Sequence, residues 1–419
     1  MRYGVVGGGM LGLKLAQRLQ QAGHQVTVLE AGNEVGGLAA AWQIGDLTWD
    51  KHYHVILLSD LNVRKLLGEL GLEEELRWVE TKTGFYTDGR LYSMSNSWEF
   101  LTFPPLGLID KFRLGLTIMR ASRVKDWQYL ERVTVADWLT KWSGKKTFQK
   151  IWLPLLRSKL GESYKKASAA FIWAIIARMY AARRSGLKKE MFGYVRGGYA
   201  TILRRFSEYL TSAGVEVRTQ QRVAQITQQG NEIAIEMANG TSQIFDRVVV
   251  TSAAPQAAQL CPQLSAQEQN TLQQVTHQGI VCASLVLKQP LAKYYVTNIT
   301  DDWVPFTAVI EMSTLVDRSE LGGNSLVYLP KYVAPDDPHF RLSDDELRER
   351  FLVALERMYP HFHREQVLAF QVSRVKHVFA LSTLNYSQHV PPVTTSFPGL
   401  YLVNSSHIVN GTLNVNETL

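Results

Sequence analysis

The sequence predicts an α/β protein in which an amino-terminal β-α-β unit begins a parallel sheet that a later segment rejoins. An apolar run at residues 3–6 is followed by a glycine-rich turn, an apolar stripe with helical spacing and a second apolar run at residues 25–29. Residues 98–190 show mainly helical patterns, and a buried-strand pattern returns at residues 246–251. We therefore expect a sheet that is split by long insertions.

The glycine-rich turn has a spacing that suits a dinucleotide. Gly7, Gly9 and Gly12 follow the first strand as G-x-G-x-x-G. Gly7 permits a tight turn, Gly9 lets backbone amides approach a pyrophosphate, and Gly12 lets the helix pack on the sheet. The helix start offers unpaired N–H groups to phosphates, and Glu30 is placed to accept hydrogen bonds from ribose hydroxyls. A Rossmann-like nucleotide-binding domain is predicted.

A paired glycine then follows the acid. Gly36 and Gly37 lie shortly after Glu30 and are followed by small residues at positions 39–41. This segment resembles the FAD-binding flavoprotein superfamily of amine oxidases, protoporphyrinogen oxidases, phytoene-type desaturases and, more distantly, UDP-galactopyranose mutase. The resemblance implies FAD as the resident cofactor, with the glycine pair near its diphosphate and ribityl chain. It covers both ends of the chain and residues 193–255 well, and the remainder loosely.

Further cofactor contacts are implied by the resemblance alone. Val223 corresponds to a residue whose backbone meets the adenine end, and residues 397–404 to the last strand of the nucleotide-binding domain. Asn404 or Ser405 stands where the family often has an acid, so a hydrogen bond would replace the charge. Residues 412–418 resemble the start of a helix that points at the flavin pyrimidine ring. The predicted FAD contacts are Gly7, Gly9, Met10, Leu11, Gly12, Glu30, Ala31, Gly36, Gly37, Leu38, Val223, Asn404, Asn414 and Val415.

Candidate catalytic residues lie in the segment 50–55, which reads DKHYHV. A D-x-G-x-H-like segment lies close to the flavin in the resembled superfamily, and this chain departs from it by placing Lys51, His52 and Tyr53 before His54. One interpretation is that Tyr53 and His54 border the flavin or the substrate, and the other is that they are polar residues at a strand end. The candidates are His54, Tyr53 and His52, with Arg196 as a further one.

The helical region at residues 98–190 is rich in Leu, Trp, Arg and Lys. Residues 110–125 predict a basic amphipathic helix, and Thr134 is expected to cap the helix 134–142. This helical region has two interpretations. In the first it is a lid that covers a hydrophobic substrate and also contacts a membrane surface. In the second it is a lid whose apolar residues form its own core and whose basic residues form a solvated face. The basic residues that could instead gather around an anionic group are Arg157, Lys159, Arg178, Arg183 and Arg184.

The predicted organisation has three parts. The FAD-binding domain is discontinuous and takes residues 1–58, 193–256 and 393–419. Residues 59–192 form a mainly helical cap and substrate region, which includes a hairpin with its turn at Asp88-Gly89. Residues 257–392 form an α+β substrate-binding domain, with predicted strands at 280–287, 306–311 and 325–329 and a helix at 344–359 capped by Ser343.

The resemblance implies an FAD-dependent oxidoreductase that transfers a hydride from its substrate to flavin N5, and together with the apolar composition of the cap it suggests a hydrophobic or lipid-like substrate. Two alternatives stay open. One is a non-redox flavoenzyme resembling UDP-galactopyranose mutase, for which the scattered arginines would suit a diphosphate. The other is a membrane-surface binding protein that keeps FAD as a structural element.

Composition and charge restrict the partners. The net charge of +7 and a pI near 9.2 favour anionic partners, either phosphate-bearing substrates or a membrane face. Two cysteines, Cys261 and Cys282, are too few for a disulfide framework, and we find no metal-ligand spacing. We expect a small-molecule substrate, no metal and no nucleic acid, and we leave the oligomeric state open. The first strand begins directly after Met1, so no leader peptide is expected and the predicted location is the cytoplasm or its membrane surface.

Overall fold

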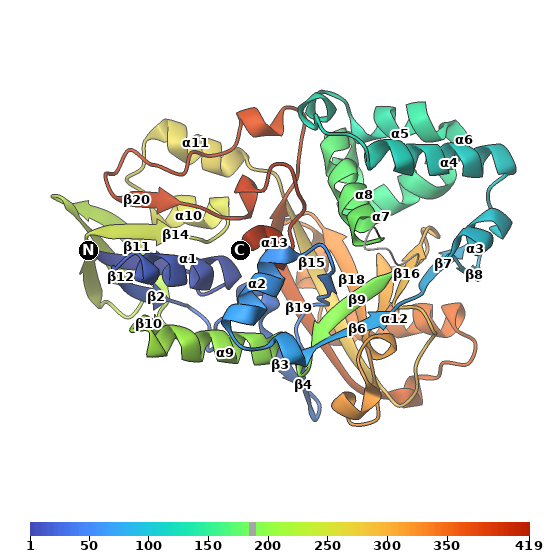
Figure 1. The fold of residues 1–419 in the computed structure, drawn as a ribbon, viewed down its shortest axis with the longest axis horizontal. Coiled ribbons are helices and arrows are strands. Elements are labelled where there is room, and N and C mark those ends of the chain that lie inside the picture. Colours follow the sequence, from blue (N-terminus) through green and yellow to red (C-terminus); the bar gives the residue numbers. More distant parts are fainter. Residues whose placement is uncertain (184–189) are drawn as a thin grey trace.

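The computed structural model describes residues 1–183 and 190–419, and a five-stranded parallel sheet lies at one end of the molecule (Figure 1). Its strands come from three separate parts of the chain. In spatial order they are β10 (Glu216–Arg218), β2 (Gln25–Leu29), β1 (Arg2–Val6), β14 (Arg247–Val250) and β20 (Leu400–Leu402). The predicted α/β class is confirmed. Insertions separate some neighbouring strands widely in sequence, and Val6 of β1 pairs with Val250 of β14, 244 positions later.

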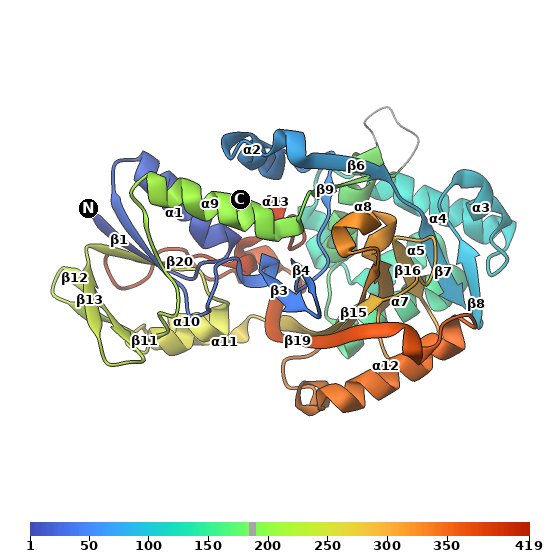
Figure 2. The ribbon, with the colours of Figure 1, turned by 90° about the horizontal axis from the view of Figure 1, so that it is seen from below.

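Helices cover one face of this sheet and a small antiparallel sheet covers the other. Helices α1 (Met10–Gln21) and α9 (Gly198–Ser212) lie side by side on the first face (Figure 2). The second face packs against the hairpin sheet β11 (Val223–Gln229), β12 (Glu232–Met237) and β13 (Ser242–Phe245), together with α10 (Ala254–Leu260) and α11 (Ala266–Gln274). Successive side chains of a strand point to opposite faces of the sheet. Val5 of β1 is therefore buried under the helices, and Val6 is buried under the hairpin sheet.

A seven-stranded sheet forms the opposite end of the molecule. Its spatial order is β19 (Val367–Ala380), β15 (His277–Leu287), β18 (Ser325–Val333), β17 (Ala308–Glu311), β16 (Val296–Ile299), β7 (Thr83–Thr87) and β8 (Arg90–Ser93). Helix α12 (Asp344–Met358) covers one face, and Ser343 forms the predicted cap with Glu346. The hairpin β7–β8, with positive φ at Asp88 and Gly89, joins this sheet through β16.

The helical cap lies beside that sheet (Figure 1). It comprises α3 (Ser97–Thr102), α4 (Leu108–Ala121), α5 (Val135–Ser143), α6 (Lys145–Thr147), α7 (Leu153–Leu160) and α8 (Ala169–Arg183). The Thr134 side chain accepts a hydrogen bond from the Asp137 N–H, so the predicted cap is confirmed. Helices α5, α7 and α8 share one apolar core with Phe379 of β19 and with Leu381, which follows that strand.

Short elements join the two ends. One of them is a hairpin formed by β3 (Ala41–Ile44) and β4 (Leu47–Asp50). Strand β9 (Met191–Val195) pairs with β5 (Ile56–Leu57) and β6 (Leu76–Glu80), and α2 (Leu61–Glu69) packs against the carboxyl-terminal helix α13 (Val415–Thr418). The three domain boundaries given above stay a prediction.

Two features are absent from the described ranges, 1–183 and 190–419. No helix there combines the length and the apolar character that crossing a bilayer requires. No group of three His, Cys, Asp or Glu side chains there is placed to hold a metal ion.

Candidate functional site

The glycine turn after β1 leaves open space at the start of α1. Gly7 has a φ of +111°, which favours glycine. A Cβ atom on Gly12 would lie 1.9 Å from the Gly7 carbonyl oxygen, so the strand and the helix touch there through backbone. A Cβ on Gly9 would meet nothing within 4 Å. Gly9 is the N-cap of α1 and no side chain caps this helix, so its first turn, with Met10 and Leu11, is free to meet a ligand.

Glu30 is held at the end of β2 by backbone amides. Its Oε2 accepts a hydrogen bond of 2.7 Å from Gly8 N, and its Oε1 accepts one of 2.7 Å from Gly32 N. Ala31 lies between Glu30 and Gly32 in the sequence. A carboxylate has about four acceptor sites, so capacity remains for ribose hydroxyls. Val223 is buried at the first position of β11, next to a bulge.

The glycine pair lies against the first turn. Gly36 N donates to Gly8 O at 2.8 Å, and Gly9 and Gly36 form an isolated parallel bridge. Gly36 and Gly37 both have positive φ, and a Cβ on Gly37 would lie 3.3 Å from the Gly9 Cα. Leu38 follows, and its carbonyl contacts the His52 ring. The tertiary structure thus brings together Gly7 to Gly12, Gly36 to Leu38 and the segment that holds His52.

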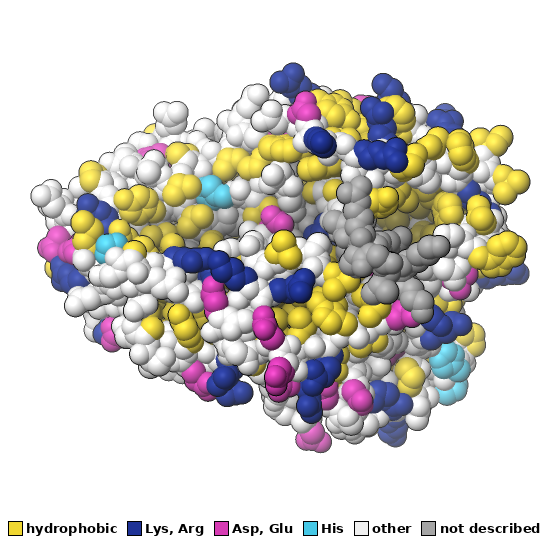
Figure 3. Space-filling view, viewed as in Figure 1, with side chains coloured by type: hydrophobic (Ala, Val, Ile, Leu, Met, Phe, Trp, Pro, Cys, Tyr) yellow, Lys and Arg dark blue, Asp and Glu magenta, His cyan; other side chains and the backbone are white. Residues whose placement is uncertain are grey.

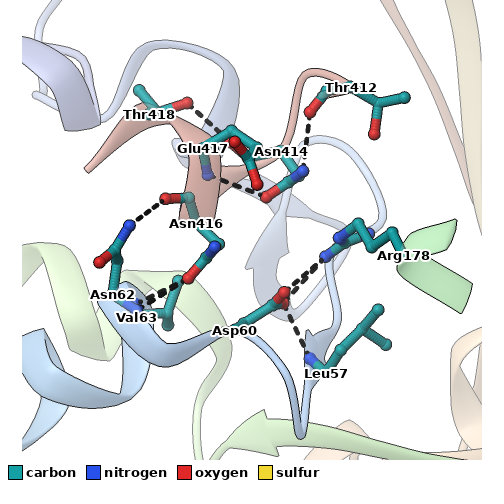
Figure 4. Close-up of polar contacts among 10 residues, drawn as sticks. All are labelled: Leu57, Asp60, Asn62, Val63, Arg178, Thr412, Asn414, Asn416, Glu417 and Thr418. Carbon is teal, nitrogen blue, oxygen red and sulfur yellow. Dashed lines mark hydrogen bonds and ion pairs between the residues drawn. The ribbon is translucent and has the colours of Figure 1, made fainter. Parts of the chain in front are cut away.

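Asn404 brings an unpaired donor to the end of β20. Its Oδ1 accepts hydrogen bonds from Ser406 N at 3.0 Å and Ser406 Oγ at 2.7 Å. Its Nδ2 is buried and has no partner within the described part of the chain. Asn414 caps α13 by accepting a hydrogen bond from Glu417 N, and Val415 is the first residue of that helix. Figure 4 shows how Asn416 fixes α13 to α2 through Asn62 and Val63.

These features fit FAD. The open space at Gly9 and the uncapped helix start suit a pyrophosphate, and the orphaned Asn404 Nδ2 is a donor that a bound acceptor would satisfy. Glu30, Val223, Asn414 and Val415 keep their assigned roles as predictions.

His52 is buried and bonded on both ring nitrogens. Its Nδ1 lies 3.2 Å from Leu38 O, and its Nε2 lies 3.2 Å from Ser373 Oγ on β19. Burial, with a smaller contribution from neighbouring His54, lowers the pKa of His52 to about 4. The ring is therefore neutral at physiological pH and links the glycine pair to the seven-stranded sheet.

This shifted pKa predicts a pH dependence of stability. The unfolded chain protonates His52 below about pH 6.5, whereas the folded protein does so only below about pH 4. Between these values the unfolded state binds more protons, so this residue lowers the free energy of unfolding as pH falls, by up to about 3 kcal/mol. Chemical denaturation at pH 7 and pH 4.5 should show a smaller loss of stability for His52→Gln than for the wild type. Replacement of exposed His363 by Gln is the control, and an equal loss in all three proteins would contradict the assignment.

Tyr53 belongs to an aromatic wall. Its hydroxyl lies 2.8 Å from the hydroxyl of Tyr332 on β18. Burial raises the pKa of Tyr53 to about 12 and raises the pKa of Tyr332 well above its ordinary value. Both hydroxyls are therefore protonated at neutral pH. The Tyr332 ring lies 6.1 Å from that of Phe379, which stacks at 6.3 Å on Phe171 of α8.

His54 lies next to a buried carboxylate. Its Nδ1 is 3.7 Å from Asp50 Oδ2, and its ring lies 4.9 Å from that of Tyr199. Burial raises the pKa of Asp50, against the opposing effect of the nearby His54. All three residues line a cavity of about 10 Å³, which is close to the volume that one water molecule needs. His54 Nδ1 is buried without a hydrogen-bond partner among the described residues, so such a water would satisfy it.

Arg196 is not brought to this cluster. Its side chain is 56% exposed and its Nε lies 3.9 Å from Glu75 Oε2. The roles of His52, Tyr53, His54 and Arg196 in catalysis stay predictions.

Lys159, named above among five basic residues that could gather around an anionic group, lies instead against aromatic rings. Its Nζ lies 3.5 Å from the centroid of the Tyr332 ring and 5.7 Å from that of Phe379. Burial lowers the pKa of this ammonium to about 7, and among the described residues no carboxylate pairs with it. The sequence offered only a basic residue in a helix, because Tyr332 is 173 positions away and no local signal joins the two.

The other basic candidates do not converge with Lys159. Arg157 is exposed and lies 3.4 Å from Glu162. Arg178 pairs with Asp60 at 2.8 Å, and both line a pocket of about 280 Å³ between α8 and residues 410–417. Arg184 and the side chain of Arg183 lie outside the described residues.

Comparison with known proteins decides the family. The family model of flavin-containing amine oxidoreductases matches residues 11–414. The chain belongs to this family. The predicted superfamily, the oxidoreductase class and FAD as the cofactor are thereby confirmed. A small-molecule substrate accords with that class.

Individual relatives match over shorter stretches. A 15-cis-phytoene desaturase of Narcissus pseudonarcissus is 40% identical over 160 residues, which cover 33% of this chain and 27% of the relative. A zeta-carotene desaturase of Synechocystis sp. is 26% identical over 252 residues, which cover 54% of this chain and 50% of the relative. The chain thus spans between about a quarter and a half of these two relatives.

Solved structures show the same fold. A putative protoporphyrinogen oxidase from Exiguobacterium sp. 255-15 superposes with a TM-score of 0.77 at 18% identity. The superposition covers 100% of this chain and 96% of that one. At this identity the likeness establishes the fold alone.

Proposed function

We propose that this protein is an FAD-dependent dehydrogenase that removes hydrogen from C–H bonds of an apolar, lipid-like small molecule. Supporting this, the two curated relatives described above are named as desaturases of 15-cis-phytoene and of zeta-carotene. The family assignment supports flavin-dependent oxidation, and the interior of the cap supports an apolar substrate.

The observation that carries the proposal is the aromatic wall between α8, β18 and β19. Phe171, Phe379 and Tyr332 follow one another at ring separations of 6.3 and 6.1 Å. Tyr332 then hydrogen bonds to Tyr53, which belongs to the segment predicted to border the flavin. Aromatic surfaces with few charges favour an apolar molecule.

The chain's own residues have separate tasks. Gly9 and the start of α1 would hold the pyrophosphate, Glu30 the ribose and Asn404 an acceptor on the cofactor. When bound, FAD accepts a hydride at N5. Desaturation also releases a proton from the neighbouring carbon. Lys159 Nζ can take up that proton near neutral pH, because burial lowers its pKa to about 7.

The first test is the absorption spectrum of the purified protein, followed by anaerobic incubation with a detergent-solubilised polyene hydrocarbon or a short alkylamine. Bleaching of the oxidised flavin bands by the polyene and not by the amine supports the proposal. Bleaching by the amine alone overturns the apolar substrate. Turnover that needs reduced flavin but consumes no electrons would favour the mutase-like alternative, and bound FAD that no substrate reduces would favour a structural role.

Lys159→Met is expected to retain FAD and to lose most turnover. If Lys159 accepts the proton, the wild-type turnover number should rise with pH through about 7 as the amine becomes neutral. The variant should be slower by about 100-fold, within the range for general bases, and should lack that rise. The matched control is Lys165→Met, which removes an exposed lysine paired with Glu162. A wild-type pH profile in Lys159→Met would show that another group takes the proton.

A further inference from the structure

We propose that helices α3 and α4 dock this protein on the anionic lipid surface of a membrane. The proposal concerns a surface of the cap and stands independently of the redox chemistry. The α3–α4 surface is defined by seven large apolar side chains whose exposed fractions lie between 37% and 76%. They are Trp98, Leu101, Leu108, Ile109, Phe112, Leu116 and Met119.

The outward face of α4 is an apolar stripe. Ile109, Phe112, Leu116 and Met119 are spaced by three or four residues, so they lie on one side of the helix. An amphipathic helix of a water-soluble protein normally turns such a stripe inward. Here the stripe faces solvent, although a contiguous exposed apolar patch is uncommon unless something covers it.

Polar groups lie on the inward face of the same helix. Lys111 is buried, and its Nζ donates to Leu101 O at 2.6 Å, which fixes α3 to α4. Thr117 is also buried, and its Oγ1 donates to Arg113 O at 2.8 Å. The helix therefore keeps its buried polar groups satisfied while its exposed side is apolar.

Positive charge borders the stripe. Apart from the buried Lys111, residues 108–125 hold four basic residues and one acidic residue. The acidic one, Asp110, lies 3.3 Å from Lys146, so its charge is compensated. Arg113 and Arg120 are exposed on α4, and the Arg120 guanidinium stacks 3.8 Å above the Trp142 ring. Hydrophobic side chains gather beside Lys and Arg over this part of the cap (Figure 3).

The combination identifies lipid as the occupant. A helix that lies in the membrane interface presents Trp, Phe and Leu to the acyl chains and Lys or Arg to the headgroups. Basic residues near the surface strengthen binding to anionic lipid. Arg113 and Arg120 complement a negative headgroup layer, and the overall charge of +7 adds long-range attraction.

The experiment is flotation of the full chain, with FAD bound, on vesicles of phosphatidylcholine with and without 30% phosphatidylglycerol. We expect the wild type to float with the anionic vesicles and to bind the neutral vesicles at least tenfold more weakly. Ile109→Ser with Phe112→Ser should reduce the bound fraction at least tenfold. Arg113→Gln with Arg120→Gln should reduce binding to anionic vesicles and leave weak binding to neutral vesicles unchanged.

The matched control replaces exposed apolar residues elsewhere, Val353→Ser with Leu368→Ser, and should float like the wild type. Equal FAD content and melting temperature show that all variants fold. The proposal is overturned if the variant at Ile109 and Phe112 floats with anionic vesicles as the wild type does. It is also overturned if the wild type does not bind anionic vesicles. A third contradicting result would be a wild-type dimer in size-exclusion chromatography that becomes a monomer in this variant, because a second copy of the chain would then cover the stripe. Flavin reduction by solubilised substrate should persist in every variant, so failure of the docking proposal is distinguishable from failure of the proposed function.

Discussion

Gly12→Ala is expected to abolish FAD binding and to lower the free energy of unfolding by about 3 kcal/mol. The added Cβ would lie 1.9 Å from the Gly7 carbonyl oxygen. Both groups are backbone, so α1 can make room only by moving away from β1. Overpacking typically lowers the free energy of unfolding by about 1–3 kcal/mol. We expect a value near the upper end of this range, because the added Cβ meets a backbone atom. The displaced helix would also carry its N-terminal amides away from the pyrophosphate. Flavin absorbance per protein and thermal unfolding measure both effects.

Gly9→Ala separates cofactor binding from folding. A Cβ at Gly9 would meet nothing within 4 Å, and the backbone there has φ −70° and ψ 174°, which alanine adopts readily. We therefore expect wild-type stability without FAD and at least tenfold weaker FAD affinity, because the methyl group would occupy the space predicted for phosphate. Gly115→Ala, on α4 with similarly open space, is the control for both measurements. Normal FAD binding by both Gly9→Ala and Gly12→Ala would refute the predicted cofactor position.

The second large effect is expected at the buried ion pair between α8 and α2. The Asp60 carboxylate accepts hydrogen bonds from Arg178 Nη2 at 2.8 and 3.1 Å and from Leu57 N at 2.9 Å (Figure 4). Asp60 is 3% exposed, so Asp60→Ala would leave the partly buried guanidinium uncompensated. Breaking a buried pair costs about 3–5 kcal/mol. Denaturant titration of Asp60→Ala should show that the free energy of unfolding falls by an amount in that range.

A double-mutant cycle tests this assignment. Asp60→Ala combined with Arg178→Met removes both charges, so the double variant should be more stable than the sum of the single losses predicts. Arg157→Met is the control, because this exposed side chain pairs with an exposed Glu162 and such pairs contribute about 0–1 kcal/mol. Additive losses at Asp60 and Arg178 would mean that the pair does not couple the cap to α2.

Sequence signals that act over a few residues predicted their elements correctly. The spacing of Gly7, Gly9 and Gly12 predicted the β1–α1 turn, and the structure supplies the contact that requires glycine at position 12. The Asp88-Gly89 turn and the caps at Thr134 and Ser343 were also read directly from neighbouring residues. The expected amphipathic helix at 110–125 is α4, with bounds of Leu108–Ala121.

The 14-residue strand β19 was not predicted. Its sequence mixes apolar residues with Arg374, Lys376 and His377, and few of its side chains are fully buried. Alternation is therefore weak, and the strand is specified mainly by its pairing with fully buried β15. Such pairing joins residues about 80–100 positions apart, which no local pattern reveals.

The sequence by itself determined the nucleotide-binding fold, its cofactor class and the positions of the glycines in the turn between β1 and α1. Only the tertiary structure decided that Arg178 neutralises Asp60, that Lys159 lies over Tyr332 and that the apolar face of α4 points to solvent. The physical reason is the range of the interactions. Turns and caps depend on residues a few positions apart, whereas burial, charge pairing and exposure depend on which distant segments meet in the folded chain.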